Sequence, residues 1–377
     1  MELQESLTDQ FLDVSTLPIT GIQSHASNLL VLKNGDILCT WFSGTEEGKD
    51  DVSIYVSRRK YGSKKWSEAQ KMSNNPGRSD QNPMLFETGS NDIWLMYTTQ
   101  LGGNQDTALV EYRISKDGGE TWSKQAVLFP HEEGVFIRQP LVITDKDEWL
   151  LPVFHCLAKD GKPWDGSYDY SAVRISKDQG ENWTEYRVPN STGYVHMDIQ
   201  KTHSGYLGLF RSRWADNIYV SFSKDGKVWS SPEKTSLPNN NASIQSTILP
   251  DGNVVVAFND SSASNATKRR ASLYSNELEE IKEEDNTKEK RAFWGAPRAP
   301  MTVALSEDDG KTWKYKRNIA EGSGFALTND SANKKNREFS YPAIAVNKNG
   351  KIDLTFTYFR QKIAFVELSE QWIKGEQ

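Results

Sequence analysis

A short pattern, Ser-x-Asp-x-Gly-x-Thr-Trp or a close variant of it, occurs four times in this chain. Each copy follows a stretch of alternating apolar and polar residues, and the copies lie at residues 115–122, 176–183, 223–229 and 306–313. Ser and Asp side chains bond backbone N–H groups a few residues on, and Gly supplies the positive φ of a tight hairpin. Each copy therefore predicts a structural turn between antiparallel strands. With one or two oxygen ligands apiece, the copies do not indicate a calcium or other metal site.

The Trp residues that end these turns mark a longer repeat. Counting two weaker copies, they stand at positions 66, 122, 183, 229, 313 and 372. Within the units, Asn-Gly or Asp-Gly pairs separate short apolar runs, as at 34–35 and 251–252, which is a strong hairpin signal. Six four-stranded sheets around one axis form a β-propeller. We therefore expect an all-β, six-bladed β-propeller as a single domain over residues 1–377.

Two segments are expected to depart from the plain repeat. Residues 11–17 are predicted to supply a strand that closes the last blade. The interval from Trp229 to Trp313 is the longest in the series and contains a polar, charged stretch. It predicts an inserted loop within the fifth blade, over residues 261–298.

Net charge, cysteine content and apolar runs limit the partners and the cellular location that we expect for this chain. The net charge of −6 gives no indication of binding to nucleic acid or to an anionic membrane. Cys39 and Cys156 fall in different predicted blades, so we expect buried free thiols. No apolar run is long enough to span a membrane and no signal peptide follows Met1, so we expect a cytoplasmic protein or a mature form without its leader. No motif indicates a cofactor.

The turns, the six units and the order of strands resemble the BNR/Asp-box proteins of the sialidase (neuraminidase) superfamily, over nearly the whole chain. The resemblance implies a site at the propeller axis, where the innermost strands begin, on the face opposite the Asp-box turns. The starts of the predicted first strands are rich in polar residues: His25, Arg78, Gln81, Arg138, His196, Asp198, Glu338 and Tyr341. Arg211 ends a second strand, where it can reach either the site or a neighbouring blade. His, Arg and Tyr around one axis indicate a site for an acidic ligand.

In that superfamily three arginines bind the sugar carboxylate, a Tyr activated by a Glu is the nucleophile, and an Asp is the acid/base. Aligned on the predicted turns, Tyr341 matches the nucleophile and Arg298 the third arginine, while loop 45–51 offers Glu47 or Asp50 as the acid/base. The remaining positions differ from the superfamily pattern. His25 and Asn259 stand where the superfamily has two of its arginines, and Ser243 stands near the position of its activating Glu.

His and Asn lack the planar donor pair of Arg, so these differences argue against ordinary N-acetylneuraminate hydrolysis. Glu338, three residues before Tyr341, is an alternative activating carboxylate, although an odd spacing in a strand directs it to the other face.

Three functions remain open. The first, which we expect, is an exo-glycosidase for a terminal acidic sugar, with Tyr341 as nucleophile, Glu47 or Asp50 as proton donor, and Arg298 with Arg138 or Arg78 on the acid group. The second is a uronate lyase in which His25 and Tyr341 serve as base and acid. The third is a glycan-binding propeller without turnover, with aromatic platforms such as Trp41, Trp164 and Trp214. In each case the expected partner is an acidic carbohydrate.

Overall fold

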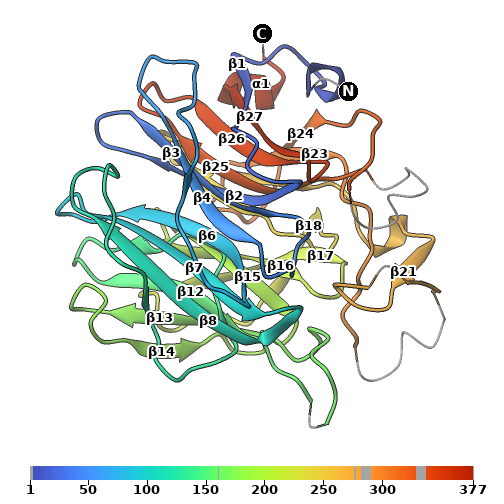
Figure 1. The fold of residues 1–377 in the computed structure, drawn as a ribbon. Coiled ribbons are helices and arrows are strands. Elements are labelled where there is room, and N and C mark those ends of the chain that lie inside the picture. Colours follow the sequence, from blue (N-terminus) through green and yellow to red (C-terminus); the bar gives the residue numbers. More distant parts are fainter. Residues whose placement is uncertain (1–2, 160, 276, 282–289, 328–336, 377) are drawn as a thin grey trace.

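Six antiparallel sheets surround a common axis in the computed structural model of the protein (Figure 1), and this six-bladed β-propeller confirms the predicted fold class. The structure describes residues 3–376, apart from 160, 276, 282–289 and 328–336. Helices are short: α1 (Glu370–Lys374), η1 (Leu3–Ser6) and η2 (Ala263–Asn265). No helix among the described residues is long and apolar enough to cross a membrane.

Each of the first three blades is a meander that runs outward from the axis. Blade one comprises β2 (Gln23–Val31), β3 (Ile37–Gly44), β4 (Ser53–Arg59) and β5 (Gln70–Lys71). Blade two comprises β6 (Ser79–Glu87), β7 (Ile93–Leu101), β8 (Asn104–Ser115) and β9 (Ala126–Val127). The innermost strand of blade three is split into β10 (Val135–Phe136) and β11 (Val142–Ile143), which both pair with β12 (Trp149–His155); β13 (Tyr170–Ser176) and β14 (Thr184–Arg187) follow.

The remaining blades repeat this order. Blade four comprises β15 (Tyr194–Thr202), β16 (Gly205–Ser212), β17 (Asn217–Ser223) and β18 (Glu233–Pro238). Blade five comprises β19 (Gln245–Ile248), β20 (Val254–Asn259), β23 (Met301–Ser306) and β24 (Tyr315–Ala320). Blade six comprises β25 (Phe339–Val346), β26 (Ile352–Tyr358), β27 (Lys362–Leu368) and, as its outer strand, β1 (Asp13–Thr16).

Pairing of β1 with β27 closes the ring. The two strands are antiparallel, with Asp13 opposite Glu367 and Thr16 opposite Ala364. The described ends of the chain, η1 and α1, lie close together (Figure 1), and Trp372 Nε1 donates to Asp9 at 2.9 Å. The strand predicted within residues 11–17 is confirmed, and closure of the last blade by a distant segment ties the chain ends into one cooperative unit.

The Asp-box turns have the hydrogen bonds that their residue types predict. In the second copy, the Ser176 hydroxyl donates to Asp178 at 2.8 Å and accepts from the Gly180 N–H at 2.8 Å, while Asp178 accepts from the Asn182 N–H at 2.8 Å. These turns join third to fourth strands, at the end of the blades opposite the starts of the first strands. The boxes therefore shape the scaffold and lie away from the axial site.

Apolar residues fill the spaces between neighbouring blades. Between blades five and six, for example, Val255, Met301, Leu354 and Phe356 are fully buried in one cluster. Strand β20 is buried on both faces, which explains its continuous apolar run over residues 254–258 before the polar Asn259. Cys39 and Cys156 are buried and unbridged, as expected.

Residues 261–298 lie between β20 and β23 and depart from the blade repeat. They carry a small hairpin, β21 (Lys268–Arg270) with β22 (Leu278–Glu280), which stands apart from the six sheets in Figure 1. Like every link between a second and a third strand, this segment leaves its blade at the end where the first strands begin. The insertion is thus at the same end of the propeller as the polar strand starts.

Candidate active site

A repeated irregularity shapes the inner strands at the axial site. The pairing register shifts within β2, β6, β15 and β25, and each shift contains a non-glycine residue with positive φ. These residues are Ala26, Asn82, His196 and Tyr341, with φ between 48° and 55°. A β-bulge re-aims the side chain at the extra residue, and a non-glycine residue at positive φ costs free energy that functional sites commonly tolerate. The bulges place His196 and Tyr341 at equivalent positions around the axis.

Tyr341 lies within a group of arginines from three other blades. Its hydroxyl accepts a 2.7 Å hydrogen bond from Arg211 Nη1, at the end of β16. The guanidinium carbons of Arg138 and Arg298 each lie 5.5 Å from its ring centroid, and the His25 ring lies 4.2 Å away. Blades three, four and five each contribute an arginine, so the site is built by assembly of the whole propeller.

These charges change the acidity of the tyrosine. Burial raises the pKa of Tyr341, whereas the positive charges of Arg211 and Arg298 lower it. The lowering effect is the larger, so the pKa lies below the ordinary value of 10. A phenolate at this position is therefore stabilised by cations rather than by a neighbouring general base. Among the described residues, no carboxylate hydrogen-bonds to the Tyr341 hydroxyl.

The two histidines beside Tyr341 are held in their neutral form. Burial lowers the pKa of His25 well below its usual range, and Arg360 adds to the effect; for His196 the causes are burial and then Arg211. His25 Nδ1 pairs with the Thr357 hydroxyl at 2.8 Å, whereas its Nε2 is buried without a hydrogen-bond partner in the described structure. A neutral imidazole with a free nitrogen can accept a proton.

Two carboxylates neutralise part of the arginine group. Glu338 accepts from Arg298 Nη1 at 2.9 Å and from Arg360 Nε at 3.2 Å. Burial raises the pKa of Glu338, but Arg360 and Arg298 hold it well below its usual range. Arg360 also forms an ion pair with Glu47. Glu338 therefore serves as a counter-ion for two arginines, and Arg360 draws the Glu47 loop to the cluster.

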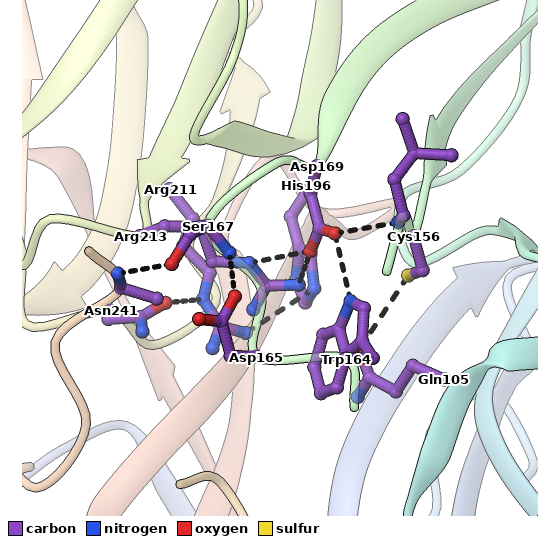
Figure 2. A network of polar contacts seen from close by, with 12 residues as sticks. Gln105, Cys156, Trp164, Asp165, Ser167, Asp169, His196, Arg211, Arg213 and Asn241 are labelled. Carbon is purple, nitrogen blue, oxygen red and sulfur yellow. Dashed lines mark hydrogen bonds and ion pairs between the residues drawn. The ribbon is translucent and has the colours of Figure 1, made fainter. Parts of the chain in front are cut away.

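Arg211 is oriented by a chain of hydrogen bonds (Figure 2). Its Nε donates to Asn241 Oδ1 at 2.7 Å, and the other end of that amide donates to the Phe293 carbonyl at 2.9 Å. Two residues further on, Arg213 binds the fully buried Asp169 at 2.6 Å. Alternation along β16 puts Arg211 and Arg213 on one face of the strand, yet Arg211 bonds Tyr341 at the axial cluster while Arg213 pairs with Asp169.

Several buried donors in this group have no protein partner. Among the described residues these include Arg138 Nε and Nη1 and Arg211 Nη2. Burial lowers the pKa of Arg138 to about 10 and that of Arg211 to about 9. An unmade hydrogen bond from a buried charged donor costs roughly 1–3 kcal/mol or more, which an anionic ligand would recover. The arrangement is suited to an oxyanion next to Tyr341.

The sequence matches the BNR repeat-like domain over residues 35–354. The chain belongs to this BNR-repeat family. No protein of curated function matches it.

Solved structures with this fold include several sialidases. The Hadza microbial sialidase Hz136 has a TM-score of 0.68 and 15% identity, over 94% of this chain and 67% of its own. The NanB sialidase of Streptococcus pneumoniae has a TM-score of 0.65 and 13% identity, over 99% and 73%. A Dyadobacter fermentans protein of unknown function has a TM-score of 0.68 and 14% identity, over 95% and 98%. At these identities the likeness shows a common sialidase-type fold and leaves the activity to the site itself.

The BNR-repeat propeller gathers eight of the sequence-predicted site residues into the axial cluster or its counter-ions. They are His25, Glu47, Arg138, His196, Arg211, Arg298, Glu338 and Tyr341. The other four predicted residues form hydrogen bonds outside this cluster or are exposed to solvent: Asp50, Arg78, Gln81 and Asp198. Arg78 donates to the carbonyls of Thr99 and Thr107, and Asp50 is exposed.

Gln81 and Asp198 are both buried. Gln81 Nε2 donates to Ser79 at 3.2 Å. Asp198 accepts from the Ser246 N–H at 2.6 Å, which ties β15 to β19, and burial raises its pKa to about 6. Asp198 therefore joins two blades. No group of three or more His, Cys, Asp or Glu suited to a metal occurs in the described part of the chain.

Two residues that contact the cluster, Arg360 and Asn241, were not among the predicted site residues. Arg360 follows the end of β26, and Asn241 precedes β19. Antiparallel pairing sets the end of each second strand beside the start of the first, as Tyr358 opposite Phe339 shows. The same rule that placed Arg211 could have found Arg360. Asn259, aligned with an arginine of the superfamily, instead donates to the Pro300 and Phe339 carbonyls at 2.8 and 2.6 Å.

The tryptophans considered as sugar platforms are mostly interior. Trp41 is fully buried and donates to Thr20 at 3.2 Å, while Trp164 donates to Asp169 at 2.9 Å. Both indole groups pack within or between blades. They do not offer an open ring face to a glycan.

Proposed function

We propose that the protein is a retaining exo-glycosidase that acts on a terminal acidic sugar. The observation that carries this proposal is the contact between Tyr341 and Arg211 inside a group of incompletely neutralised arginines. That environment favours a phenolate nucleophile and binds an acid group next to it. The sialidase-type fold supports the same class of substrate.

The proposed reaction has two steps. Tyr341 Oη attacks the anomeric carbon while the bond to the leaving-group oxygen breaks, and that oxygen takes a proton from Glu47. Water then gives a proton to Glu47 and attacks the same carbon, which releases the Tyr341 oxygen. The anomeric configuration is retained because it is inverted twice.

The acid group of the sugar has defined partners. Arg211 Nη2 and two nitrogens of Arg138 are buried and free to donate, and the Arg298 guanidinium carbon lies 5.5 Å from the Tyr341 ring centroid. The resulting donor set differs from the one that alignment on the turns implied, because Arg138 and Arg211 stand in for His25 and Asn259. We expect a carboxylate to bind here, on a sugar whose other substituents fit this altered set.

A second candidate, a uronate lyase, is favoured by one observation: His25 is neutral, has a free Nε2 and lies 4.2 Å from the Tyr341 ring. His25 would remove the C5 proton while an arginine neutralises the carboxylate. Tyr341 would protonate the departing C4 oxygen, and a C4–C5 double bond would form without consumption of water.

One panel experiment tests both reactions. The protein is incubated with terminal sialosides and uronides, and both new reducing ends and the ultraviolet absorbance of an unsaturated uronate are followed. Reducing sugar without absorbance supports the glycosidase, and absorbance selects the lyase. Binding without product across the panel would contradict both and leave a non-catalytic glycan-binding protein.

A substitution of Tyr341 tests whether the reaction occurs at this site. Tyr341→Phe is expected to lower turnover by roughly a thousandfold or more, because it removes the nucleophile or acid. The matched control is Tyr61→Phe, which removes an exposed hydroxyl bonded to Asn349. Full activity in Tyr341→Phe, with melting temperatures equal in all three proteins, would show that the chemistry occurs elsewhere.

A further inference from the structure

The insertion of blade five extends across the end of the propeller that holds the site. On blade four, the Phe293 N–H donates to the Arg213 carbonyl at 2.7 Å. On blade three, Trp294 Nε1 donates to the Asp165 carbonyl at 3.1 Å. On blade two, the Tyr274 hydroxyl accepts from Gln100 at 2.9 Å. A segment that leaves blade five and reaches these three blades must pass over the axial mouth.

The insertion also touches the residues that surround Tyr341. Trp294 is 2% exposed, and the guanidinium carbons of Arg211 and Arg213 lie 5.8 and 5.2 Å from its ring centroid. The Phe293 carbonyl holds Asn241, the partner of Arg211 (Figure 2 shows Asn241 and Arg211 side by side). The segment therefore forms a wall of the site rather than a separate surface feature.

One charged residue of this wall lacks a counter-ion. Arg270, the last residue of β21, is 5% exposed, donates from Nη1 to the Leu273 carbonyl at 2.6 Å, and has a buried Nε without a partner. Within the described chain no carboxylate lies within ion-pair distance of it. Burial, followed by the charges of Arg298 and Arg360, lowers the pKa of Arg270 to about 9. The Arg270 N–H donates to the Trp294 carbonyl at 2.9 Å, and the Trp294 ring lies 5.8 Å from the guanidinium carbon of Arg211, so Arg270 belongs to the wall of the axial cluster.

The charges of the cluster do not balance. Glu338 and, after it has donated its proton, Glu47 offset at most two of the arginines, Arg298 and Arg360. Three buried arginines have unpartnered nitrogens and no carboxylate within ion-pair distance among the described residues: Arg138, on which the charge of Asp198 acts, Arg211 and Arg270. Tyr341 as a phenolate and one ligand carboxylate supply two negative charges. A second anionic group on the ligand would pair with Arg270, whose buried Nε has no partner in the described structure.

We propose that Arg270 binds a second anionic group of the ligand, so that the substrate is an acidic sugar carrying both a carboxylate and a sulfate or phosphate ester. This inference rests on the proposed function, in which the axial site binds a sugar acid. The inserted segment then acts as the specificity-determining wall, since it brings the extra arginine to a site that the six blades alone would build for one acid group.

Binding measurements test the inference without turnover. Calorimetry compares methyl glucuronide and N-acetylneuraminate with the positional isomers of their monosulfate and monophosphate esters, using the wild-type chain, Arg270→Gln and Arg270→Lys. The matched control is Lys268→Gln, which removes the same charge from an exposed residue of the same hairpin. Melting temperatures verify that each variant is folded.

At least one ester is expected to bind the wild type roughly tenfold more tightly than its parent acid, as a charge-assisted bond implies. Arg270→Gln is expected to remove this advantage and to bind the parent acid within about twofold of the wild type. Arg270→Lys is expected to retain part of the advantage, because it keeps the charge but loses the planar donor pair. The sulfate and phosphate arms identify which ester the site prefers.

Other results separate the two proposals. If the parent acids bind and no ester binds more tightly, or if both Arg270 variants keep the ester advantage, the second anion site is wrong while the proposed function stands. If Arg270→Gln weakens parent and ester equally, Arg270 binds the first acid group and the inference is again wrong. If the wild type binds neither class, the proposed function fails with it.

Discussion

Arg211 Nη1 donates a 2.7 Å hydrogen bond to the hydroxyl of Tyr341, a residue 130 positions away in the chain. Arg211 ends the second strand of blade four, and Tyr341 sits in the bulge of the first strand of blade six. Both side chains are almost fully buried. A cation in this position can stabilise the tyrosine anion, which gives the site a nucleophile without a carboxylate base at the hydroxyl.

The first prediction concerns the ionisation of Tyr341. Among the groups that lower the pKa of Tyr341, Arg211 has the largest effect. Arg211→Gln is therefore expected to raise this pKa, because less positive charge then counteracts the effect of burial. An ultraviolet difference titration of tyrosinate, with Tyr341→Phe as the reference for assignment, measures the shift. A rate that depends on the phenolate would rise with pH through this pKa, and the rise would move to higher pH in Arg211→Gln.

The control for this titration is Arg187→Gln. That guanidinium lies 3.9 Å from the ring centroid of Tyr170, on the outer part of blade three. It is expected to leave the Tyr341 titration unchanged. An identical titration in the wild type and Arg211→Gln would show that the arginine does not control the acidity of the tyrosine.

The second prediction concerns Asn241 as a positioning residue. Asn241→Ala removes the acceptor of Arg211 Nε and is expected to lower turnover roughly tenfold to a hundredfold through misplacement of the guanidinium. The pKa of Tyr341 should rise in parallel. Asn240→Ala is the matched control, because the neighbouring amide bonds the Pro297 carbonyl rather than Arg211. Reduced stability with an unmoved tyrosine titration would assign Asn241 a merely structural role.

The third prediction concerns the ion pair beneath the insertion. Arg213 and Asp169 are 1% and 0% exposed, and Asp169 also accepts from Trp164 Nε1 (Figure 2). Asp169→Ala leaves a buried, unpaired guanidinium and is expected to cost about 3–5 kcal/mol in the free energy of unfolding. Glu280→Gln, in an exposed pair with Lys268, is expected to cost less than about 1 kcal/mol. Urea denaturation compares the two, and equal small losses would mean that the buried pair is dispensable.

The fourth prediction concerns pH and stability. Asp353 is fully buried in β26, accepts from Asn347 at 3.0 Å, and has an Oδ2 without a partner in the described structure. Burial raises its pKa from 3.8 to about 7. The folded state therefore binds a proton that the unfolded state has released, so stability is lost as pH rises from about 4 to about 7.

Asp353→Asn should remove this loss. The substitution is expected to raise the free energy of unfolding at pH 8 by an amount on the order of 2–4 kcal/mol, and to change it little at pH 4. Thermal melts across this range provide the measurement, with Asp50→Asn on the exposed loop as a control. A variant that is no more stable than the wild type at pH 8 would contradict a protonated Asp353 in the native protein.

The sequence was sufficient for the elements whose causes are local. Ser176, Asp178 and Gly180 close their turn within a few residues, so the pattern predicts the hairpin regardless of the rest of the chain. Repetition of that turn led to six blades and to the terminal strand that closes them. Tyr341 and Arg298 were located in the same way, because they lie at fixed distances from predicted turns.

Only the tertiary structure decided which charges meet. Bulges at His196 and Tyr341 shift the pairing register, so simple alternation does not give the direction of their side chains. Arg211, Arg298 and Arg360 come from separate blades, and no spacing along the chain links these arginines to one another. The sequence by itself determined the blades, since turns and strands follow from neighbouring residues; closure of the ring decided the chemistry, since electrostatic effects depend on distances in space.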